Sequence, residues 1–295
     1  MDLGFPQRIG PYELLELVAS GTRGAVARAR ADSDGSIVAL KFFPQHAKDD
    51  TLSAKRFLRE GQALSTLQHP NIVASRGTGE DAGFYWMAME YVEGPNLKEL
   101  LIQHHHLKEK EVVRLGLALA DALAHMHALG IHHRDVKPEN ILIARDGAPK
   151  LADLGLAKGL NLTKVSVSGS DTVVGTPTFM APEQARGNSA VDGRTDEYSL
   201  GCTLYYAATG QPPYQGKNPA AVMLLHTRGG IPHPKTVLTN LSNGFCTILA
   251  HMLALKQDDR YPKLDEVREE FAALQAGRPL QRKAPAPEAS NFALV

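Results

Sequence analysis

The sequence has few cysteines, and the two that it has, Cys202 and Cys246, lie far apart among 295 residues. Their separation matches no usual spacing of metal-binding cysteines, and a disulfide framework would need more of them. Both are therefore expected to be small apolar residues of a core in a reducing compartment.

The chain also lacks an excess of charge of either sign and a long hydrophobic run. Lys plus Arg and Asp plus Glu number 32 each, so the formal net charge is zero. A nucleic acid or an acidic membrane surface is therefore not expected as the main partner. No apolar run reaches the ~18 residues of a membrane-spanning helix, and the first residues show no signal-peptide pattern. We expect a cytoplasmic protein with no membrane span in this chain.

The most informative stretch is residues 131–143, which read I-H-H-R-D-V-K-P-E-N-I-L-I. Pro138 has no backbone N–H and disfavours helix for the residue before it, so the stretch is predicted to be a loop between two apolar segments. The loop carries a carboxylate at Asp135, an ammonium at Lys137 and an amide at Asn140. Phosphoryl transfer from a nucleotide needs such a base, cation and Mg²⁺ ligand. The alternative is a buried turn whose polar groups cap one another.

The pattern H-R-D-x-K-P-x-N resembles the catalytic loop of protein kinases. The resemblance extends from about Ile9 to Leu274 and is closest to the bacterial, eukaryotic-like serine/threonine protein kinases. It implies that Asp135 orients and deprotonates the substrate hydroxyl and that Lys137 steadies the γ-phosphate of ATP. Asn140 would hold Mg²⁺, with Mn²⁺ as an alternative ion.

Residues 19–26, A-S-G-T-R-G-A-V, resemble the kinase glycine-rich loop, whose backbone N–H groups cover the nucleotide phosphates. Ala19 departs from the pattern because the first glycine is expected there, and a hairpin without a phosphate role is the alternative. The resemblance implies a nucleotide-binding set that runs from this loop to the segment after the catalytic loop: Val18, Ala19, Gly21, Gly24, Val26, Ala39, Lys41, Met89, Glu90, Val92, Asn96 and Leu142.

The sequence V-A-L-K that ends at Lys41 resembles the strand whose lysine reaches the α- and β-phosphates and is held by a glutamate of the next helix. We expect that helix at residues 51–68, where the motif R-F-L-R-E favours Glu60 as the partner. Gly61 beside it should weaken the helix by about 1 kcal/mol relative to alanine.

A nearly continuous apolar strand is expected at residues 84–92, in the position of the kinase hinge. The resemblance puts Met89 at the back wall of the nucleotide site, and backbone groups of Glu90 and Val92 opposite the adenine edge. Asn96 falls where an acidic contact to the ribose is common.

The motif D-L-G at residues 153–155 follows the catalytic loop, as D-F-G does in kinases, so Asp153 is expected to be a second Mg²⁺ ligand. Residues 160–174 are predicted to be a mobile loop that runs into G-T-P-T-F-M-A-P-E. Thr176 matches the threonine that contacts the catalytic aspartate and lysine. Arg134 marks the type of kinase in which a phosphorylated loop residue pairs with this arginine. The candidate phosphorylation sites, led by Thr172, are Thr172, Ser170, Ser168, Ser166 and Thr163.

An amphipathic helix is expected at residues 109–129. Residues 191–210 resemble the buried central helix of the large lobe of kinases. By resemblance, Asp196 braces the backbone of the catalytic loop, and Arg260 pairs with Glu183 of the A-P-E motif. Seven histidines crowd the region before the catalytic loop, and a metal site is the alternative to a structural role for them: His104, His105, His106, His125, His127, His132 and His133.

The fold expected from the resemblance is α+β and two-lobed, with ATP between the lobes. A small antiparallel-β N-lobe with one helix would span about residues 9–92, and a mainly α-helical C-lobe about residues 97–275. Residues 1–8 are expected to be a leader. Residues 276–295, rich in Pro, Ala and charge, are expected to be a disordered tail or linker.

The function expected from the resemblance is ATP- and Mg²⁺-dependent phosphorylation of serine and threonine in proteins, with self-association for autophosphorylation of the loop. A pseudokinase that binds nucleotide without turnover is one alternative, motivated by Ala19, Gly61 and Leu154. A small-molecule phosphotransferase of the same fold is another, although such enzymes usually lack the A-P-E segment.

Overall fold

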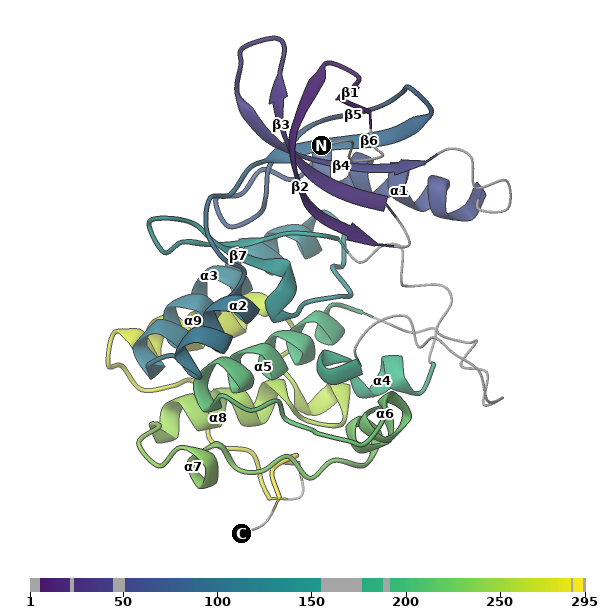
Figure 1. Ribbon diagram of the computed structural model, residues 1–295. Helices are drawn as coiled ribbons and strands as arrows, with labels where there is room; N and C mark the ends of the chain where they lie inside the picture. The colour runs from purple at the N-terminus through teal and green to yellow at the C-terminus, as the bar shows by residue number, and fades with distance from the viewer. Residues whose placement is uncertain are drawn as a thin grey trace. The chain divides into compact units, whose positions relative to one another are not determined.

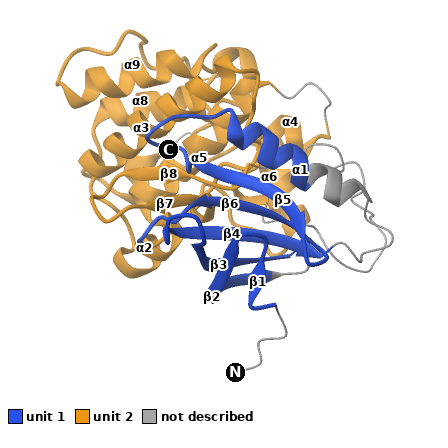
Figure 2. Cartoon of the chain, turned by 90° about the horizontal axis from the view of Figure 1, so that it is seen from above, with its two compact units in different colours: residues 1–94 blue, residues 95–295 orange. Residues whose placement is uncertain are grey.

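The computed structural model describes residues 6–21, 24–44, 51–154, 177–187, 192–287 and 289–293, with the backbone alone for residues 51–56. The chain divides into two compact units, Met1–Gly94 and Pro95–Val295, which Figure 2 colours separately. Of the helices in the described residues, none has the length and apolar character that crossing a membrane requires.

Unit 1 is a six-stranded antiparallel sheet with one helix, in the order β1-β2-β3-β4-β6-β5 (Figure 1). The helix, α1 (Thr51–Ser65), lies against β5 and β6. The expected strands and helix of the N-lobe are therefore confirmed. The strands are β1 (Arg8–Ile9), β2 (Tyr12–Gly21), β3 (Gly24–Ala31), β4 (Ile37–Pro44), β5 (Ser75–Asp81) and β6 (Phe84–Glu90).

Strand β3 shows why this sheet has two different faces. Its sequence G-A-V-A-R-A-R-A alternates, so that every second residue is a buried alanine. The alanines pack against Ile9, Val38 and Leu40 in the core of the sheet. Successive side chains of a strand point to opposite faces, so Val26 and Arg28 lie on the other face. That second face is the one on which the predicted nucleotide residues fall.

Gly61 has a packing reason inside α1. A methyl group at this position would lie 2.4 Å from Cγ2 of Thr78 and 3.2 Å from Cε of Met87. The missing side chain therefore lets α1 approach β5 and β6 closely, which offsets the low helix propensity of glycine.

Unit 2 is mainly helical, with one short two-stranded sheet, β7 (Ile141–Ile143) paired with β8 (Pro149–Leu151). This agrees with the expected C-lobe, and the α+β fold class is confirmed. The α-helices are α2 (Leu97–His104), α3 (Glu109–Ala128), α4 (Pro182–Ala185), α5 (Gly193–Thr209), α6 (Pro219–Arg228), α7 (Pro234–Val237), α8 (Asn243–Met252) and α9 (Leu264–Gln275). The described residues of the unit also include the 3-10 turns η1 (Pro138–Asn140), η3 (Pro177–Phe179) and η4 (Gln257–Asp259).

Helix α5 is the centre of unit 2. It begins after Asp192, whose side chain accepts the N–H of Arg194, and ends at Gly210 in the left-handed conformation with φ of 73°. Most of its residues are buried, polar ones included, because α3, α8 and α9 all pack on it. The buried polar residues of α5 therefore need partners from neighbouring segments.

One such partner set is the ion pair of Arg260 with Glu183, which the resemblance had implied. The two guanidinium nitrogens lie 2.8 and 2.9 Å from the two carboxylate oxygens, and Arg260 is 1% exposed. Thr195 of α5 donates to the same carboxylate at 2.8 Å. The guanidinium also lies 4.8 Å from the centre of the Tyr198 ring.

The tail differs from the prediction of disorder over residues 276–287 and 289–293, which pack on unit 2. Backbone N–H groups of Gln281 and Arg282 donate to the two oxygens of Glu270, a carboxylate that is 1% exposed. The Arg282 guanidinium lies over the Tyr261 ring at 4.7 Å. Composition predicted disorder because the tail is rich in Pro, Ala and charge, but buried acceptors and an aromatic face of unit 2 hold it instead.

We predict that Arg260→Lys lowers the free energy of unfolding by about 3 kcal/mol, because one ammonium cannot replace the two-pronged contact and leaves Glu183 buried with a poorer partner. The matched control is Arg268→Lys, since Arg268 pairs with Asp121 and Asp265 but is 38% exposed at its side chain. Urea unfolding of both variants measures the difference. Equal losses would show that the Glu183 pair is no stronger than a surface pair.

Candidate functional site

The side chains of Asp135, Lys137 and Asn140 meet in unit 2. The Lys137 ammonium lies 3.1 Å from Oδ2 of Asp135. The Asn140 amide nitrogen donates to the same oxygen at 3.0 Å and to the Asp135 backbone oxygen at 2.9 Å. The turn η1 places Asn140 here, because Pro138 starts it with a fixed φ. The carboxylate is thus oriented by one cation and one amide.

The backbone of this loop is held by hydrogen bonds to the side chain of Asp196 of α5. Its carboxylate accepts the N–H of His133 at 2.8 Å and the N–H of Arg134 at 2.6 Å. Arg134 has φ of 63°, a left-handed conformation that a non-glycine residue keeps only when its surroundings enforce it. The brace implied for Asp196 therefore has a geometric task, which is to hold a strained residue directly before Asp135.

His127, at the end of α3, is a third donor to Asp196, whereas the sequence had marked it only as one of the seven histidines near the catalytic loop. Its Nε2 lies 2.8 Å from Oδ2 of the carboxylate. Burial alone would raise the pKa of Asp196, but the hydrogen bond and charge of His127 and the N–H of Arg134 outweigh burial and lower the pKa. The carboxylate therefore stays ionised without water.

The histidine-rich region contains one group with ligand atoms close together, namely His127, His132 and Asp196, within 4.8 Å of one another. The Asp196 carboxylate already accepts three hydrogen bonds there. The role that fits these contacts is bracing of the loop. The run His104–His106 is exposed.

His133 connects the loop to the segment that carries Asp153. Its ring is fully buried, and burial lowers its pKa, so the ring is neutral. Nδ1 accepts the N–H of Asp135 at 3.3 Å, which leaves the hydrogen on Nε2, 3.1 Å from the backbone oxygen of Ala152.

Asn140 and Asp153 come from the two ends of the β7–β8 hairpin. Ile141 pairs with Leu151, and the N–H of Ala152 donates to the Asn140 backbone oxygen at 2.8 Å. The next residue is Asp153, with φ of 54°. Because the Asn140 amide nitrogen is bonded to Asp135, its oxygen is the atom directed elsewhere. A carboxylate and an amide oxygen at adjacent strand ends fit a hard divalent cation.

In unit 1, Lys41 and Glu60 form an ion pair, with the ammonium 2.8 Å from the carboxylate. Glu60 is 6% exposed and is held by α1 against the sheet, so the pair fixes the lysine side chain. The structure thus brings together the two residues that the motif R-F-L-R-E had paired.

The strand register places five of the predicted nucleotide residues of unit 1, Ala19, Val26, Ala39, Lys41 and Met89, in rows on one face. Val26 lies opposite Ala19 on one side and Lys41 on the other. In the next row, Ala39 lies opposite Met89. Directly opposed residues of an antiparallel pair share a face. The paired residues Gly21 and Gly24 lie next to the Ala19–Val26 pair at the end of strands β2 and β3. The side chain of Val18, which precedes Ala19, is 56% exposed.

Gly24 has to be glycine for a reason independent of phosphates. Its φ is +122°, and a methyl group would lie 2.3 Å from the backbone oxygen of Phe42.

The predicted hinge residues lie where β6 ends. The strand ends at Glu90, whose N–H donates to the backbone oxygen of Ala74 at 2.8 Å, and Val92 follows two residues later.

Asn96 has a role that the sequence did not indicate, because it caps α2. Its side-chain oxygen accepts the N–H of Glu99 at 2.9 Å, and the Glu99 carboxylate accepts the N–H of Asn96 at 3.0 Å. This reciprocal pair is a capping box. The backbone of Asn96 forms an isolated bridge with Leu142, so these two predicted residues lie side by side in unit 2.

Thr176 lies outside the described residues. So do all the candidate phosphorylation sites, which are Thr163, Ser166, Ser168, Ser170 and Thr172. Gln184 of α4, just beyond, donates to the backbone oxygen of Arg134 at 3.3 Å. The A-P-E segment is thereby joined to the catalytic loop.

The turn η3 is held by His226 of α6, a residue that the sequence did not single out. Nε2 lies 3.1 Å from the backbone oxygen of Thr178, and Nδ1 lies 3.1 Å from the hydroxyl of Tyr198. Burial lowers the pKa of His226 to about 4. A neutral ring accepts from the tyrosine and donates to the carbonyl, which satisfies both nitrogens.

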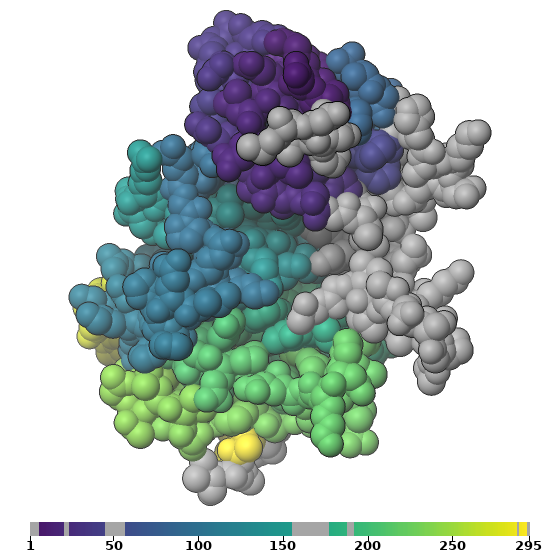
Figure 3. Space-filling view, viewed as in Figure 1, coloured from purple at the N-terminus to yellow at the C-terminus, as the bar shows by residue number. Residues whose placement is uncertain are grey.

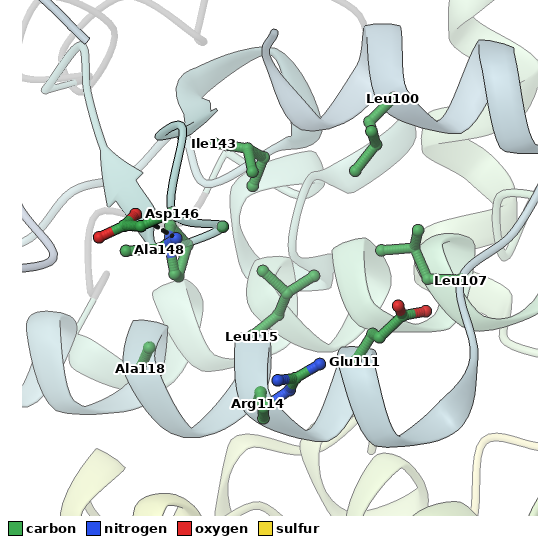
Figure 4. A pocket seen from close by; sticks show the side chains of 11 residues that line it. Leu100, Leu107, Glu111, Arg114, Leu115, Ala118, Ile143, Asp146 and Ala148 are labelled. Atoms are coloured by element: carbon green, nitrogen blue, oxygen red, sulfur yellow. Dashed lines mark hydrogen bonds between the residues drawn. The ribbon is translucent and has the colours of Figure 1, made fainter. Parts of the chain in front are cut away.

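Unit 2 also contains a pocket of about 490 Å³ (Figure 4). Leu100 of α2, Leu115 of α3 and Ile143 of β7 form apolar walls, with Glu111 and Arg114 of α3 on one side. The predicted nucleotide and catalytic residues in the described part of the chain are not among those that line it.

Comparison with known proteins gives a family match over most of the chain. The model described as "Protein kinase domain" matches residues 12–271. A probable serine/threonine-protein kinase of Streptomyces coelicolor is 34% identical over 280 residues, covering 93% of this chain and 42% of the relative. Serine/threonine-protein kinase PknB of Mycobacterium tuberculosis is 36% identical over 272 residues, covering 91% and 43%. The chain therefore spans less than half the length of these curated relatives.

We predict that Asp196→Asn lowers the free energy of unfolding by about 3 kcal/mol, because its amide group must face one of the three donors and the charge is lost. Asp192→Asn is the control at the start of the same helix, where asparagine is an equally good cap. Urea unfolding should show a loss below about 1 kcal/mol for the control. A similar loss in both variants would contradict the bracing role.

We also predict a pH dependence that comes from His226. The unfolded side chain takes up a proton below a pKa of 6.5, whereas the folded one does so only near 4. Stability should therefore fall as the pH drops from 7 to 5, by roughly 2 kcal/mol from this group. His226→Gln should flatten the pH profile by that amount when both proteins are unfolded in urea at each pH. A parallel profile for the variant would exclude His226 as the titrating group.

Proposed function

The chain belongs to the protein kinase family, and we propose that it transfers the γ-phosphate of ATP to serine and threonine hydroxyls of proteins. The observation that carries the proposal is the oriented carboxylate of Asp135. It is held by Lys137 and Asn140, and the backbone before it is braced by Asp196. A general base must be aimed as well as present, and these contacts aim it.

In this proposal Asp135 accepts the proton of the substrate hydroxyl as its oxygen attacks the γ-phosphorus, and the bond from that phosphorus to the bridging oxygen breaks, so that ADP leaves. Lys137, 3.1 Å from that carboxylate, steadies the transferring phosphoryl group. Lys41, fixed by Glu60, holds the α- and β-phosphates. Such fixed charges lower the barrier because they need no rearrangement during the reaction.

The oxygens of Asn140 and Asp153 are proposed to hold the divalent cation. Mg²⁺, when bound, would neutralise the charge that develops on the phosphate oxygens, and Mn²⁺ is the alternative ion. The hairpin that joins the two residues is fixed by the Ile141–Leu151 pair and by His133. This chain therefore supplies the ligands from a rigid element and not from separate loops.

The proposed nucleotide-binding set is the face of unit 1 with Ala19, Val26, Ala39 and Lys41, supplemented by the other residues of the set. The cross-strand rows support this, since residues distant in sequence share one face. Ala19 carries only one methyl more than the glycine it replaces, which does not remove the backbone N–H groups that a phosphate would need.

Serine and threonine are favoured as acceptors because Lys137 is the residue that serine/threonine kinases carry in this motif. We propose autophosphorylation of the segment before Thr176, led by Thr172, through self-association of two chains. Arg134 supports this because its Nε is buried with no hydrogen-bond partner among the described residues. A phosphate paired there would satisfy the guanidinium.

Proteins are the proposed partners, and nucleic acid is not, because the formal net charge is zero. A cytoplasmic location is proposed because Cys202 and Cys246 are buried free thiols, as in reducing compartments.

We predict that Asp135→Asn and Lys41→Ala each lower the phosphorylation rate by about a thousandfold or more, with unchanged folding, because the base or the phosphate cation is lost. Purified protein is incubated with labelled ATP, Mg²⁺ and a generic protein substrate. Mass spectrometry then reports transfer and the modified loop residues together.

Two variants control for the loss of a like charge elsewhere. Asp146→Asn keeps the side-chain oxygen that accepts the N–H of Ala148, and Lys256→Ala removes an exposed lysine. Both should retain the wild-type rate. Nucleotide binding without transfer by the wild-type chain would establish the pseudokinase, and full turnover by Asp135→Asn would remove the proposed base.

A further inference from the structure

The end of the described tail is built into unit 2 through Asn291, which is 4% exposed. Its amide nitrogen donates to the backbone oxygen of Leu253 at 2.8 Å. Its amide oxygen accepts the hydroxyl of Tyr214 at 3.2 Å and the N–H of Gly230 at 3.1 Å. Every polar atom of this side chain therefore has a partner in a different segment.

The backbone around Asn291 is paired as well. Its oxygen accepts the N–H of Ile231 at 3.0 Å, and the N–H of Ala293 donates to the oxygen of Ile231 at 2.7 Å. Gly229 makes room for this contact, because its φ is +86° and a methyl group there would lie 2.6 Å from the Asn291 amide oxygen. Figure 1 and Figure 3 show the end of the tail, in yellow, at the green surface of unit 2.

From Asn291 a chain of contacts leads to the turn η3. Tyr214 holds the amide oxygen with its hydroxyl, and its ring meets the ring of His226 edge to face at 4.7 Å. His226 in turn lies 3.1 Å from the backbone oxygen of Thr178. The three side chains that make these contacts, Asn291, Tyr214 and His226, are all buried and therefore have few alternative positions.

The turn η3 lies in a segment that is tied to the catalytic loop. Gln184, a few residues beyond the turn, contacts the backbone oxygen of Arg134. Since Arg134 directly precedes Asp135, this contact puts the segment beside the position to which a substrate hydroxyl is brought, whereas ATP is proposed to rest on other residues.

We propose that Asn291 is a positioning residue for the protein substrate, acting on the Pro177–Phe179 turn through Tyr214 and His226. The inference rests on the proposed kinase function and deepens it, because it assigns the tail to the substrate side of the reaction. The tail segment 289–293 is then part of the catalytic domain in function.

The test compares steady-state kinetics of the full chain and its variants with a generic protein substrate and ATP-Mg²⁺. Asn291→Ala removes the acceptor of Tyr214, and Tyr214→Phe removes the donor while keeping the ring on His226. Each should raise KM for the protein about five- to twentyfold, the effect of one lost buried hydrogen bond, with KM for ATP within about twofold. The control is Gln281→Ala, which truncates an exposed polar side chain of the same tail and should leave all constants unchanged.

A double variant separates positioning from general destabilisation. If the two residues act through one contact, Tyr214→Phe combined with Asn291→Ala should raise KM no further than Asn291→Ala alone. Should Asn291→Ala fail to fold, Tyr214→Phe carries the test by itself. Equal changes in both KM values, or none in either variant, would overturn the inference. Absence of transfer by the wild-type chain would instead overturn the proposed function.

Discussion

The structure of the catalytic loop depends on one ionised carboxylate that is entirely removed from water. The cost of removing the Asp196 carboxylate from water is offset by three hydrogen bonds, from the ring of His127 and from the backbone N–H groups of His133 and Arg134. Two of these donors belong to the loop itself. The loop backbone can therefore hold a left-handed arginine beside Asp135 only while α5 supplies this acceptor.

The same arrangement recurs elsewhere in unit 2, where buried carboxylates receive main-chain N–H groups. Glu197 of α5 accepts the N–H of Tyr261, and Glu270 of α9 accepts two from the tail. Helices of this unit thus hold irregular segments by single acidic residues and not by apolar packing alone. Burial raises the pKa of Glu197 well above its usual value, and the N–H of Tyr261 and the nearby guanidinium groups oppose this rise only in part.

Local sequence patterns predicted the secondary structure and the residues that belong to short motifs. The periodicity of residues 109–129 gave α3 within one residue, and R-F-L-R-E identified the partner of Lys41. The sequence did not predict hydrogen bonds between residues that are far apart along the chain. No motif marks His127 as a donor to Asp196, 69 residues away, or His226 as the support of Thr178. Composition was wrong about the tail: disorder was inferred from its Pro, Ala and charge, whereas hydrogen bonds to buried groups hold residues 276–287 and 289–293.

The way the tail is held also decides where the folded domain stops. The family match ends at residue 271, inside α9, although partners of buried groups continue to residue 293. A recombinant fragment cut at the end of α9 would strip Tyr214, Gly230 and Leu253 of their common partner and uncover Ile231, which is fully buried. The boundary of the domain defined by sequence similarity, residue 271, therefore differs from the boundary defined by buried contacts, residue 293.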